Sequence, residues 1–440
     1  MDFVLNLIII TADQLMLFII NLLVARHVGE QLFGDYSAAT NSLLLLATLI
    51  TLGIDSIVAY YFPKLYLKRK FLDIAQLSFA IRKFLQPIHV ATFSLGLLLA
   101  ITLIALAQAS KNLDLFEIHH PLFLFLWGTI SISLYRIFVQ FYRSINYMRT
   151  AVVLSFVQTL IYFIFALLIY FFIHDFLPQR NVVYFPHFML MAFLGSYFLT
   201  VGFCYLLFNH ISKPYKDQVQ KAPPLDKNTY PWRSKIYGYM IQNLNIYIFS
   251  TIPLLVIEVL GHNEKSVGLF AAVSSIISLA FIAISPIGIL ISPDISAALA
   301  DTKLKLKQTM TKYLFICFGI AFIITLVFGV FAKQILLLYK AQFIDALPYL
   351  YVSLINIITY SISMPLSKMI QYSKHGSALG AKLTIYFIII QIIACITLIK
   401  LFGIIGAIAC FVGINILYNL IMMIIALNLY KNHKIEKHIQ

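Results

Sequence analysis

The sequence predicts an all-α polytopic membrane protein, with about 12 transmembrane helices arranged in two six-helix lobes. The composition, a series of long apolar runs and one polar segment in the middle of the chain support this prediction. Hydrophobic residues make up 61% of the 440 residues, charged residues make up 11%, and the mean hydropathy is +0.91. Soluble globular domains contain about 45–50% apolar and about 25% charged residues, so most of this chain must be surrounded by lipid.

The apolar runs have the length and the pattern of spanning helices. A spanning helix needs roughly 20 mostly apolar residues, and the runs do not alternate at period two, which argues against transmembrane strands. Prolines stand near the start of three runs, at Pro87, Pro121 and Pro186, where their fixed φ angle is compatible with a helix. The twelve runs lie at about residues 4–26, 37–61, 85–108, 121–142, 151–174, 186–209, 236–260, 268–292, 313–331, 347–367, 383–399 and 404–428.

A polar segment rich in Lys and Pro separates the first six runs from the last six. We therefore predict an N-terminal lobe over residues 1–211, a cytoplasmic linker over 212–235, a C-terminal lobe over 236–428 and a cytoplasmic tail over 429–440. Because six is an even number, both halves enter the bilayer from the same face. This predicts parallel repeats around an axis along the membrane normal.

Each half opens with a polar hairpin between its first two runs. The hairpins lie at residues 26–37 and 261–272, and aligning Gly34 with Gly268 pairs Tyr36 with Phe270. Glycines and charged residues in a short segment between long apolar runs predict a turn outside the bilayer. The similarity of the two turns supports the internal repeat.

The basic residues predict the orientation of the helices. Of the 32 Lys and Arg residues, 24 fall in segments on one side of the predicted bilayer, seven fall on the other side, and only Arg136 lies within a run. The positive-inside rule then places both termini in the cytoplasm. The net charge of +15 reflects this topology, and we expect no nucleic-acid partner.

Two short motifs follow the first run, and related patterns of small and aromatic residues recur at residues 266–276, 292–299 and 402–416. The motifs are a Gly-x(3)-Phe-Gly-x-Tyr turn at Gly29, Phe33, Gly34 and Tyr36, and a Leu-Gly-hydrophobic-Asp signature at Leu52, Gly53, Ile54 and Asp55. With these motifs the chain resembles the polysaccharide-transporter branch, the O-antigen (Wzx-type) flippases, of the multidrug/oligosaccharidyl-lipid/polysaccharide (MOP) exporter superfamily.

The resemblance implies a MATE-like fold and a role in moving a polyprenyl-pyrophosphate-linked oligosaccharide across the bacterial inner membrane by alternating access. Its expected partners are the lipid-linked oligosaccharide and the bilayer, together with a polysaccharide polymerase and chain-length proteins. Such a transporter needs polar cavity walls for the sugar and cationic groups for the pyrophosphate. It needs no cofactor, although coupling to H⁺ or Na⁺ is compatible with the family.

Three residues near the inner end of the fourth run are candidates for binding the pyrophosphate. Arg136, Gln140 and Arg143 recur at i, i+4 and i+7, so they share one helix face. An intramembrane Arg costs at least about 2.5–3.5 kcal/mol and usually faces the interior of the bundle, and its guanidinium can donate two hydrogen bonds to a phosphate. We expect Arg136→Ala to stop polymer export without loss of protein. Snorkelling to the headgroups is the alternative.

Polar residues in the first and seventh runs form a second set of candidates. Amide side chains at helical spacing can bind sugar hydroxyls, or they can join helices by hydrogen bonds worth about 0.6 kcal/mol each. A carboxylate within a span must be paired, hydrated or protonated, so Asp13 is the candidate for ion or proton coupling, and a structural ion pair is its alternative role. For Asp55 we expect bonding within its own lobe. The candidate amides are Gln14, Asn21, Asn243 and Asn245.

The basic segment at residues 64–83 has two interpretations, an amphipathic helix on the inner leaflet or an extension of the third spanning helix.

Three functions are compatible with the whole chain. They are the flippase, a cation-coupled multidrug exporter, which Asp13 supports, and a membrane-embedded glycosyl polymerase or ligase. An enzyme is the least supported, because the sequence shows no nucleotide-binding glycines, metal motif or nucleophile–base pair.

Overall fold

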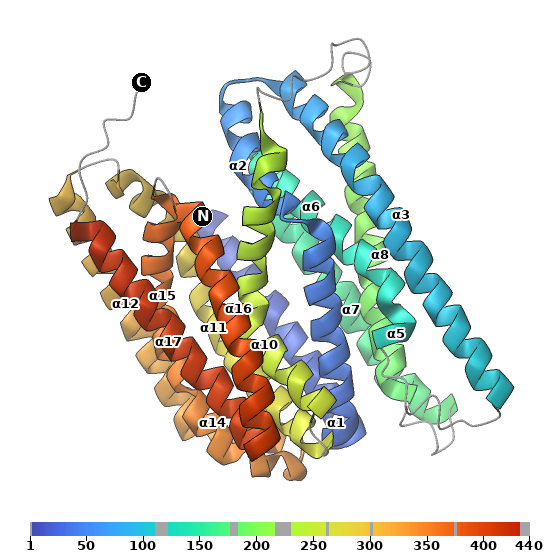
Figure 1. Ribbon diagram of the computed structural model, residues 1–440. Helices are drawn as coiled ribbons and strands as arrows, with labels where there is room; N and C mark the ends of the chain where they lie inside the picture. Colours follow the sequence, from blue (N-terminus) through green and yellow to red (C-terminus); the bar gives the residue numbers. More distant parts are fainter. Residues whose placement is uncertain are drawn as a thin grey trace. The chain divides into compact units, whose positions relative to one another are not determined.

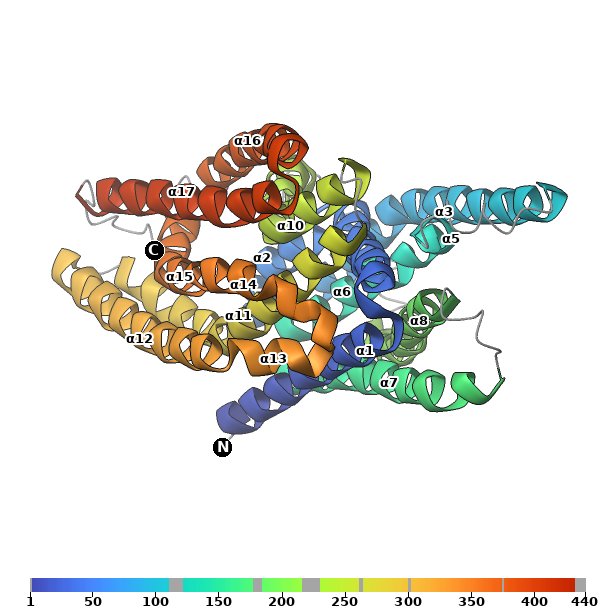
Figure 2. The same ribbon diagram turned by 90° about the horizontal axis from the view of Figure 1, so that it is seen from below.

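The computed structural model describes residues 2–110, 122–176, 184–215, 230–260, 264–299, 302–373 and 376–431. Within these ranges every regular element is a helix (Figures 1 and 2). Most of the predicted linker (216–229) and of the predicted tail (432–440) lies outside the described residues, as does the side chain of Asn245.

The chain divides into two compact units, each of which draws on both halves of the sequence. The first unit comprises Met1–Ile20 and Asp35–Leu244, and the second comprises Asn21–Gly34 and Asn245–Gln440. These units depart from the predicted lobes at two places. Residues 21–34 group with the second unit, and residues 236–244 group with the first.

The first unit contains most of the helices of the N-terminal half. They are α1 (Asp2–Thr51), α2 (Ile54–Leu67), α3 (Phe71–Ser110), α5 (Leu122–Phe125), the 3-10 helix η1 (Leu126–Gly128), α6 (Thr129–Ser144), α7 (Met148–Phe176), α8 (Phe185–Ser212), η3 (Lys213–Tyr215) and η4 (Trp232–Lys235), followed by the beginning of α10 (Ile236–Leu260). Buried side chains of α2, α3 and α6, among them Phe62, Leu77 and Tyr142, form its hydrophobic core together with Trp232.

The second unit contains the rest of α10 and the helices that follow it. They are α11 (Glu264–Leu299), α12 (Lys303–Val330), α13 (Ala332–Tyr339), η5 (Ala341–Ala346), α14 (Leu347–Ser353), α15 (Ile355–Tyr372), α16 (Gly376–Phe402) and α17 (Ile404–Lys431). The run at 383–399, the shortest of the twelve predicted runs, lies within the 27-residue helix α16.

The prediction of an all-α polytopic membrane protein with about twelve helices is confirmed. Eight helices in the described residues are long and apolar enough to cross a membrane, and the first of them, Ile8–Thr51, contains two helices joined at Gly29. The other predicted runs correspond to α5, η1 and α6, to α10, and to α11 with its apolar segment Lys265–Phe281. Large apolar side chains are exposed on the long helices, for example Phe171 on α7 and Leu206 on α8, as expected where lipid is the solvent.

The predicted hairpin at residues 26–37 is much shorter in the structure. Helix α1 continues on both sides of Gly29, whose φ of 79° and ψ of −173° break the helix at that residue alone. Glycine adopts a positive φ without a steric penalty. Just after the break, Glu30 lies 3.6 Å from Lys265 Nζ, which in turn donates to Asp345 Oδ2 at 2.7 Å.

The two glycines that the repeat aligns are in close contact with each other. A Cβ atom on Gly268 would lie 1.7 Å from the Glu30 carbonyl oxygen, and a Cβ atom on Gly34 would lie 2.9 Å from the Gly268 nitrogen. Any side chain at either position would therefore push the two backbones apart. The glycines serve this close packing, while the turn itself needs only Gly29.

The basic segment at 64–83 extends the third helix for most of its length. Helix α2 ends at Leu67, Arg69 has a φ of 55°, and α3 begins at Phe71 and continues without interruption to Ser110. Of the two interpretations, the extension of the spanning helix is confirmed for residues 71–83. Figure 1 shows α3 as one long helix.

Candidate transport sites

The Leu-Gly-hydrophobic-Asp signature forms a helix break that the predicted continuous run at 37–61 did not include. Leu52 and Gly53 have φ angles of 54° and 67°, and they separate α1 from α2. A Cβ atom on Gly53 would lie 2.5 Å from the backbone nitrogen of Met240 and 2.7 Å from the carbonyl carbon of Tyr239. Position 53 therefore requires glycine for two reasons, the positive φ and the close approach of α10.

Asp55 follows this break and is the centre of a hydrogen-bond network. Its Oδ2 accepts from Arg136 Nη2 at 3.0 Å, and the two side chains are only 14% and 20% exposed. Its Oδ1 accepts from Asn243 Nδ2 at 2.7 Å and from the Ser56 backbone N–H at 2.9 Å. The carboxylate therefore holds together α2, α6 and α10.

The other groups of the network have partners as well. Arg136 Nη1 donates to the hydroxyl of Thr48 on α1, and the Ser56 hydroxyl donates to Asn243 Oδ1 at 3.0 Å. Two predicted site residues, Arg136 and Asn243, are thus brought together. Thr48 and Ser56, which complete the network, were not candidates from the sequence, although the signature that precedes Ser56 marks the place.

The geometry bears on the role of Arg136. Both terminal nitrogens of its guanidinium bond to groups of the same unit, and one of these groups is the carboxylate of Asp55, so the charge of Arg136 already has a counter-ion. Pyrophosphate binding by Arg136 stays a prediction, and the role that the contacts favour is that of counter-ion to Asp55. For Asp55 itself, the bonds to Arg136 and to the Ser56 backbone lie within its own predicted lobe, as we expect from the sequence. Its third partner, Asn243, lies in the predicted C-terminal lobe, although the structure groups it with the first unit.

Asp13 has different surroundings from Asp55. Its side chain is 6% exposed, its Oδ2 accepts from Gln14 Nε2 at 3.1 Å, and its Oδ1 has no hydrogen-bond partner. The Thr159 hydroxyl on α7 lies near the carboxylate and donates to Gln158 Oε1 at 3.3 Å. No Lys or Arg of the described residues forms an ion pair with Asp13. The carboxylate is thus buried among uncharged polar groups.

These polar groups continue from α7 to α8. Gln158 Nε2 donates to the Ser196 hydroxyl at 2.8 Å, and both side chains are buried. On the same helix α7, the hydroxyl of Tyr162 is hydrogen-bonded to that of Tyr36 on α1. Asp13 and Gln14 therefore belong to a polar interior of the first unit that the sequence marks only at its first helix.

The remaining candidate residues lie at separate places. Gln140 contacts Ser144 one turn further along α6, at 3.5 Å, and Arg143 is exposed and forms no hydrogen bond or ion pair within the described residues. Asn21 belongs to the second unit, where it donates to the Ser275 hydroxyl at 3.3 Å. The side chain of Asn245 is outside the description. Of the two arginines predicted on this face of α6, Arg143 is the one whose guanidinium is available to an external anion.

The comparisons with known proteins concern the fold. No protein-family model matches the sequence, and no curated protein matches it. A solved structure described as the inward-facing conformation of a multidrug resistance MATE family transporter of the MOP superfamily matches with a TM-score of 0.69. The match has 16% sequence identity and covers 98% of this chain and 99% of the other.

Two further solved structures match over nearly the whole chain. A MOP superfamily transporter from Pyrococcus furiosus, described as having a reversed polarity of binding pocket that suggests a different function, has a TM-score of 0.65, 15% identity and coverage of 98% and 95%. An outward-facing multidrug resistance MATE family transporter has a TM-score of 0.60, 16% identity and the same coverage. This protein therefore has the fold of the MATE transporters of the MOP superfamily.

Proposed function

We propose that this protein is a transporter that flips a polyprenyl-pyrophosphate-linked oligosaccharide across the bacterial inner membrane by alternating access. The observation that carries the proposal is the match of the entire chain, 98% of its length at a TM-score of 0.69, to a MOP superfamily transporter. The turn motif at Gly29 and the signature around Asp55 support the polysaccharide branch, because they are the residues that carry the resemblance to it.

The groups proposed to act on the substrate are candidates that the sequence analysis named. Arg143 supplies a cation for the pyrophosphate, with Gln140 one turn away on α6. Asn21, Asn243 and Asn245 are the amides proposed for the sugar, and of these Asn243 already holds Asp55. Arg136 supports this site by keeping α6 bound to α2.

Asp13 is proposed to couple transport to H⁺ or Na⁺. A buried carboxylate without a cationic partner is stabilised by binding a proton or a small cation, and the unbonded Oδ1 leaves it a place to do so. Release of that ion would leave a bare charge in a dry interior, which favours a change of conformation. Gln14 and Thr159 hold the carboxylate in position.

A cation-coupled multidrug exporter is the second candidate function. The observation that favours it is that the similar solved structures include multidrug resistance MATE family transporters. The Asp13 site serves either function, since both substrates need an energy source. The substrate therefore has to be determined directly.

The test is transport by the purified full-length protein in liposomes. The probe is a polyprenyl-pyrophosphate disaccharide carrying a fluorophore on the sugar, and added dithionite quenches the probe molecules in the outer leaflet only. We expect the protein to make the inner-leaflet fraction accessible to the quencher, at a rate that depends on a proton or sodium gradient. Matched liposomes without protein should retain that fraction.

The same liposomes loaded with ethidium test the exporter. Ethidium movement without movement of the glycolipid probe would replace the flippase with the drug exporter. If neither probe moves while the protein is correctly inserted, both proposals fail. In cells, a tagged copy should fractionate with the inner membrane, and crosslinking would show whether a polysaccharide polymerase or a chain-length protein binds it.

A further inference from the structure

A large cavity lies within the first unit, between α3 on one side and α6 and α8 on the other. Its volume is about 1410 Å³, which exceeds the roughly 300–1,000 Å³ of ordinary small-molecule pockets. Several side chains that line it, including Phe79 on α3 and Tyr205 on α8, are more than 40% exposed. Because these helices are apolar spans, we take the open side of the cavity to face lipid.

The walls of this cavity are apolar, but its charged residues are all basic. Aromatic and aliphatic side chains such as Phe138, Phe141 and Phe208 form most of the surface, whereas Arg82, Lys83 and Arg233 are its charged residues. No Asp or Glu occurs among the described residues that line it. An apolar surface next to cations without counter-ions is complementary to an anionic amphiphile.

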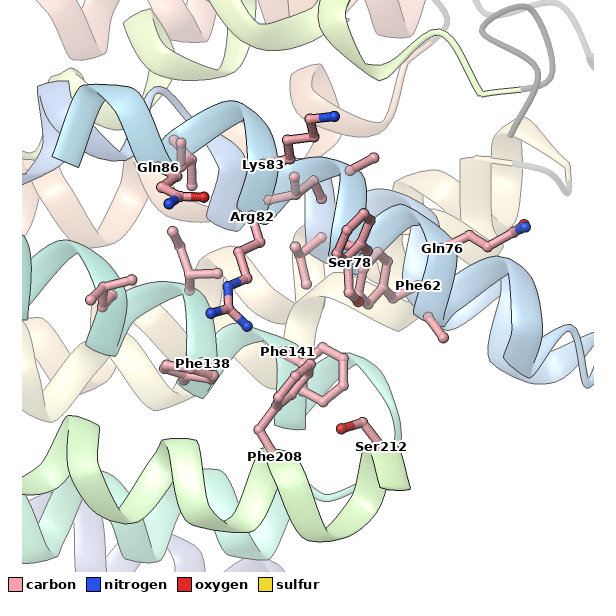
Figure 3. A pocket seen from close by; sticks show the side chains of 18 of the residues that line it. Phe62, Gln76, Ser78, Arg82, Lys83, Gln86, Phe138, Phe141, Phe208 and Ser212 are labelled. Atoms are coloured by element: carbon pink, nitrogen blue, oxygen red, sulfur yellow. The ribbon is translucent and has the colours of Figure 1, made fainter. Parts of the chain in front are cut away.

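The three cations are not equivalent. Arg233 lies over the rings of Phe84 and Trp232, at 5.6 Å and 5.4 Å from their centroids. Figure 3 shows Lys83 extending away from the cavity, while Arg82 extends from α3 into it, toward Phe138, Phe141 and Phe208. Arg82 forms no hydrogen bond or ion pair within the described part of the chain. It is the cation that is positioned to receive an anion inside the cavity.

We propose that this cavity binds an anionic glycerophospholipid, with its phosphate on Arg82 and its acyl chains along the aromatic wall of α6 and α8. Arg82 is an exposed residue of the cavity, so its guanidinium is accessible, and a phosphate can accept two hydrogen bonds from one guanidinium at once. Among anionic amphiphiles, the bilayer phospholipid is the one that always surrounds a spanning helix. The proposal does not depend on which substrate the protein transports.

The structure also provides a way to fill the cavity without disturbing the fold. Gly202 on α8 lines the cavity, and a Cβ atom at this position would meet no atom within 4 Å. Gly202→Phe should therefore occupy part of the lipid volume. Gly319 on α12 has equally open space but lies in the second unit, so Gly319→Phe is the matched control. Lys68, which is exposed and does not line the cavity, is the matched charge control for Arg82.

The experiment is native mass spectrometry of the purified full-length protein, titrated with phosphatidylglycerol, phosphatidylcholine or polyprenyl phosphate. We expect Arg82→Ala to weaken phosphatidylglycerol binding about tenfold or more, as for loss of a charge-assisted contact. Lys68→Ala and Gly319→Phe should leave it unchanged, and Gly202→Phe should reduce binding of phosphatidylglycerol and phosphatidylcholine alike. The melting temperature of each variant in detergent identifies any that fail to fold.

Three outcomes would overturn the proposal. One is equal binding of phosphatidylglycerol by the folded Arg82→Ala protein and the unchanged protein, and another is an equal loss in Lys68→Ala. The third is a preference for polyprenyl phosphate over phosphatidylglycerol that Arg82→Ala abolishes, which would make the cavity a site for the transported lipid instead. The first two outcomes do not bear on whether the protein moves a glycolipid or a drug, so failure by either is separate from failure of the proposed function. The third would overturn the phospholipid site while supporting a polyprenyl lipid as the substrate.

Discussion

Two carboxylates in the same unit, Asp55 and Asp13, have opposite surroundings. Asp55 accepts hydrogen bonds on both oxygens and pairs with Arg136 at 3.0 Å. Asp13 is hydrogen-bonded only to uncharged groups of the described residues, and its Oδ1 is unbonded. Both stand in apolar runs of the sequence. The difference teaches that two carboxylates in spans can have different partners, which is why we propose a structural role for Asp55 and ion coupling for Asp13.

The physical reason lies in what removing water does to each group. Transfer of a carboxylate into a low-dielectric interior costs several kcal/mol unless a counter-ion and hydrogen bonds offset it. For Asp55 these are provided by Arg136, Asn243 and the Ser56 backbone, and these contacts offset its burial. Asp13 forms no ion pair within the described residues, so in our proposal a bound proton or cation offsets its burial.

The largest effect is expected from Asp13→Asn. This change keeps the size of the side chain and removes the group that can bind a proton or cation. We expect transport in the liposome assay to fall to the level of protein-free liposomes, while the amount of protein in the membrane stays normal. Asp13→Asn protein that still transports and still responds to the ion gradient would contradict the coupling role.

The next effect is expected from Arg136→Ala, which leaves Asp55 without its counter-ion. Breaking a buried ion pair by removing one partner costs about 3–5 kcal/mol, so the melting temperature in detergent and the amount of folded protein should both fall. This outcome is the reverse of the expectation from the sequence, in which export stops and abundance is normal. Normal abundance combined with lost transport would restore the pyrophosphate role of Arg136.

The double variant Arg136→Ala with Asp55→Asn sharpens the comparison. Once Asp55 is neutral, the loss of Arg136 no longer leaves an unpaired buried charge, so the double variant should be less destabilised than the sum of the single variants. Arg136→Ala combined with Asp13→Asn should show additivity, because the described residues show no contact between Asp13 and Arg136. Additivity in both pairs would mean that the Asp55–Arg136 contact contributes little.

The smallest effect is expected from Ser56→Ala. Its hydroxyl donates to Asn243 Oδ1, while its backbone N–H, which bonds to Asp55, is retained. Loss of one neutral hydrogen bond costs about 1 kcal/mol, so we expect a small drop in melting temperature and unchanged transport. Transport reduced as strongly as in Asp13→Asn would show that this network takes part in the transport cycle.

The helices could be predicted from the sequence, and so could a turn near Gly29, but the length of that turn and the break between α1 and α2 could not. The length of an apolar run depends only on residues that are neighbours in the sequence, so the runs predict the spanning helices. The length of a turn does not depend on neighbouring residues alone. The charged segment at 26–37 predicts a hairpin, yet Gly29 alone provides the break. The break at Leu52 and Gly53 lies inside an apolar run, where hydropathy carries no signal of it.

The candidate site was predicted in part, for a similar reason. The sequence marks Arg136 and Asp13 as charges inside spans, because a charge in an apolar run is visible without a fold. It does not pair Arg136 with Asp55, which is 81 positions away, or place Thr48 and Asn243 around them. Nor does it show that α3 leaves a cavity beside α6 and α8, or that Arg82 extends into this cavity.

By itself, then, the sequence determined that this chain is a helical membrane protein of about twelve spans, because the cost of placing polar groups in lipid depends only on which residues stand together along the chain. The tertiary structure decided which charges are neutralised. Helix packing brings Asp55 within 3.0 Å of Arg136 and leaves Asp13 among uncharged groups. Coulombic pairing depends on distance in space, and only the packed helices set that distance.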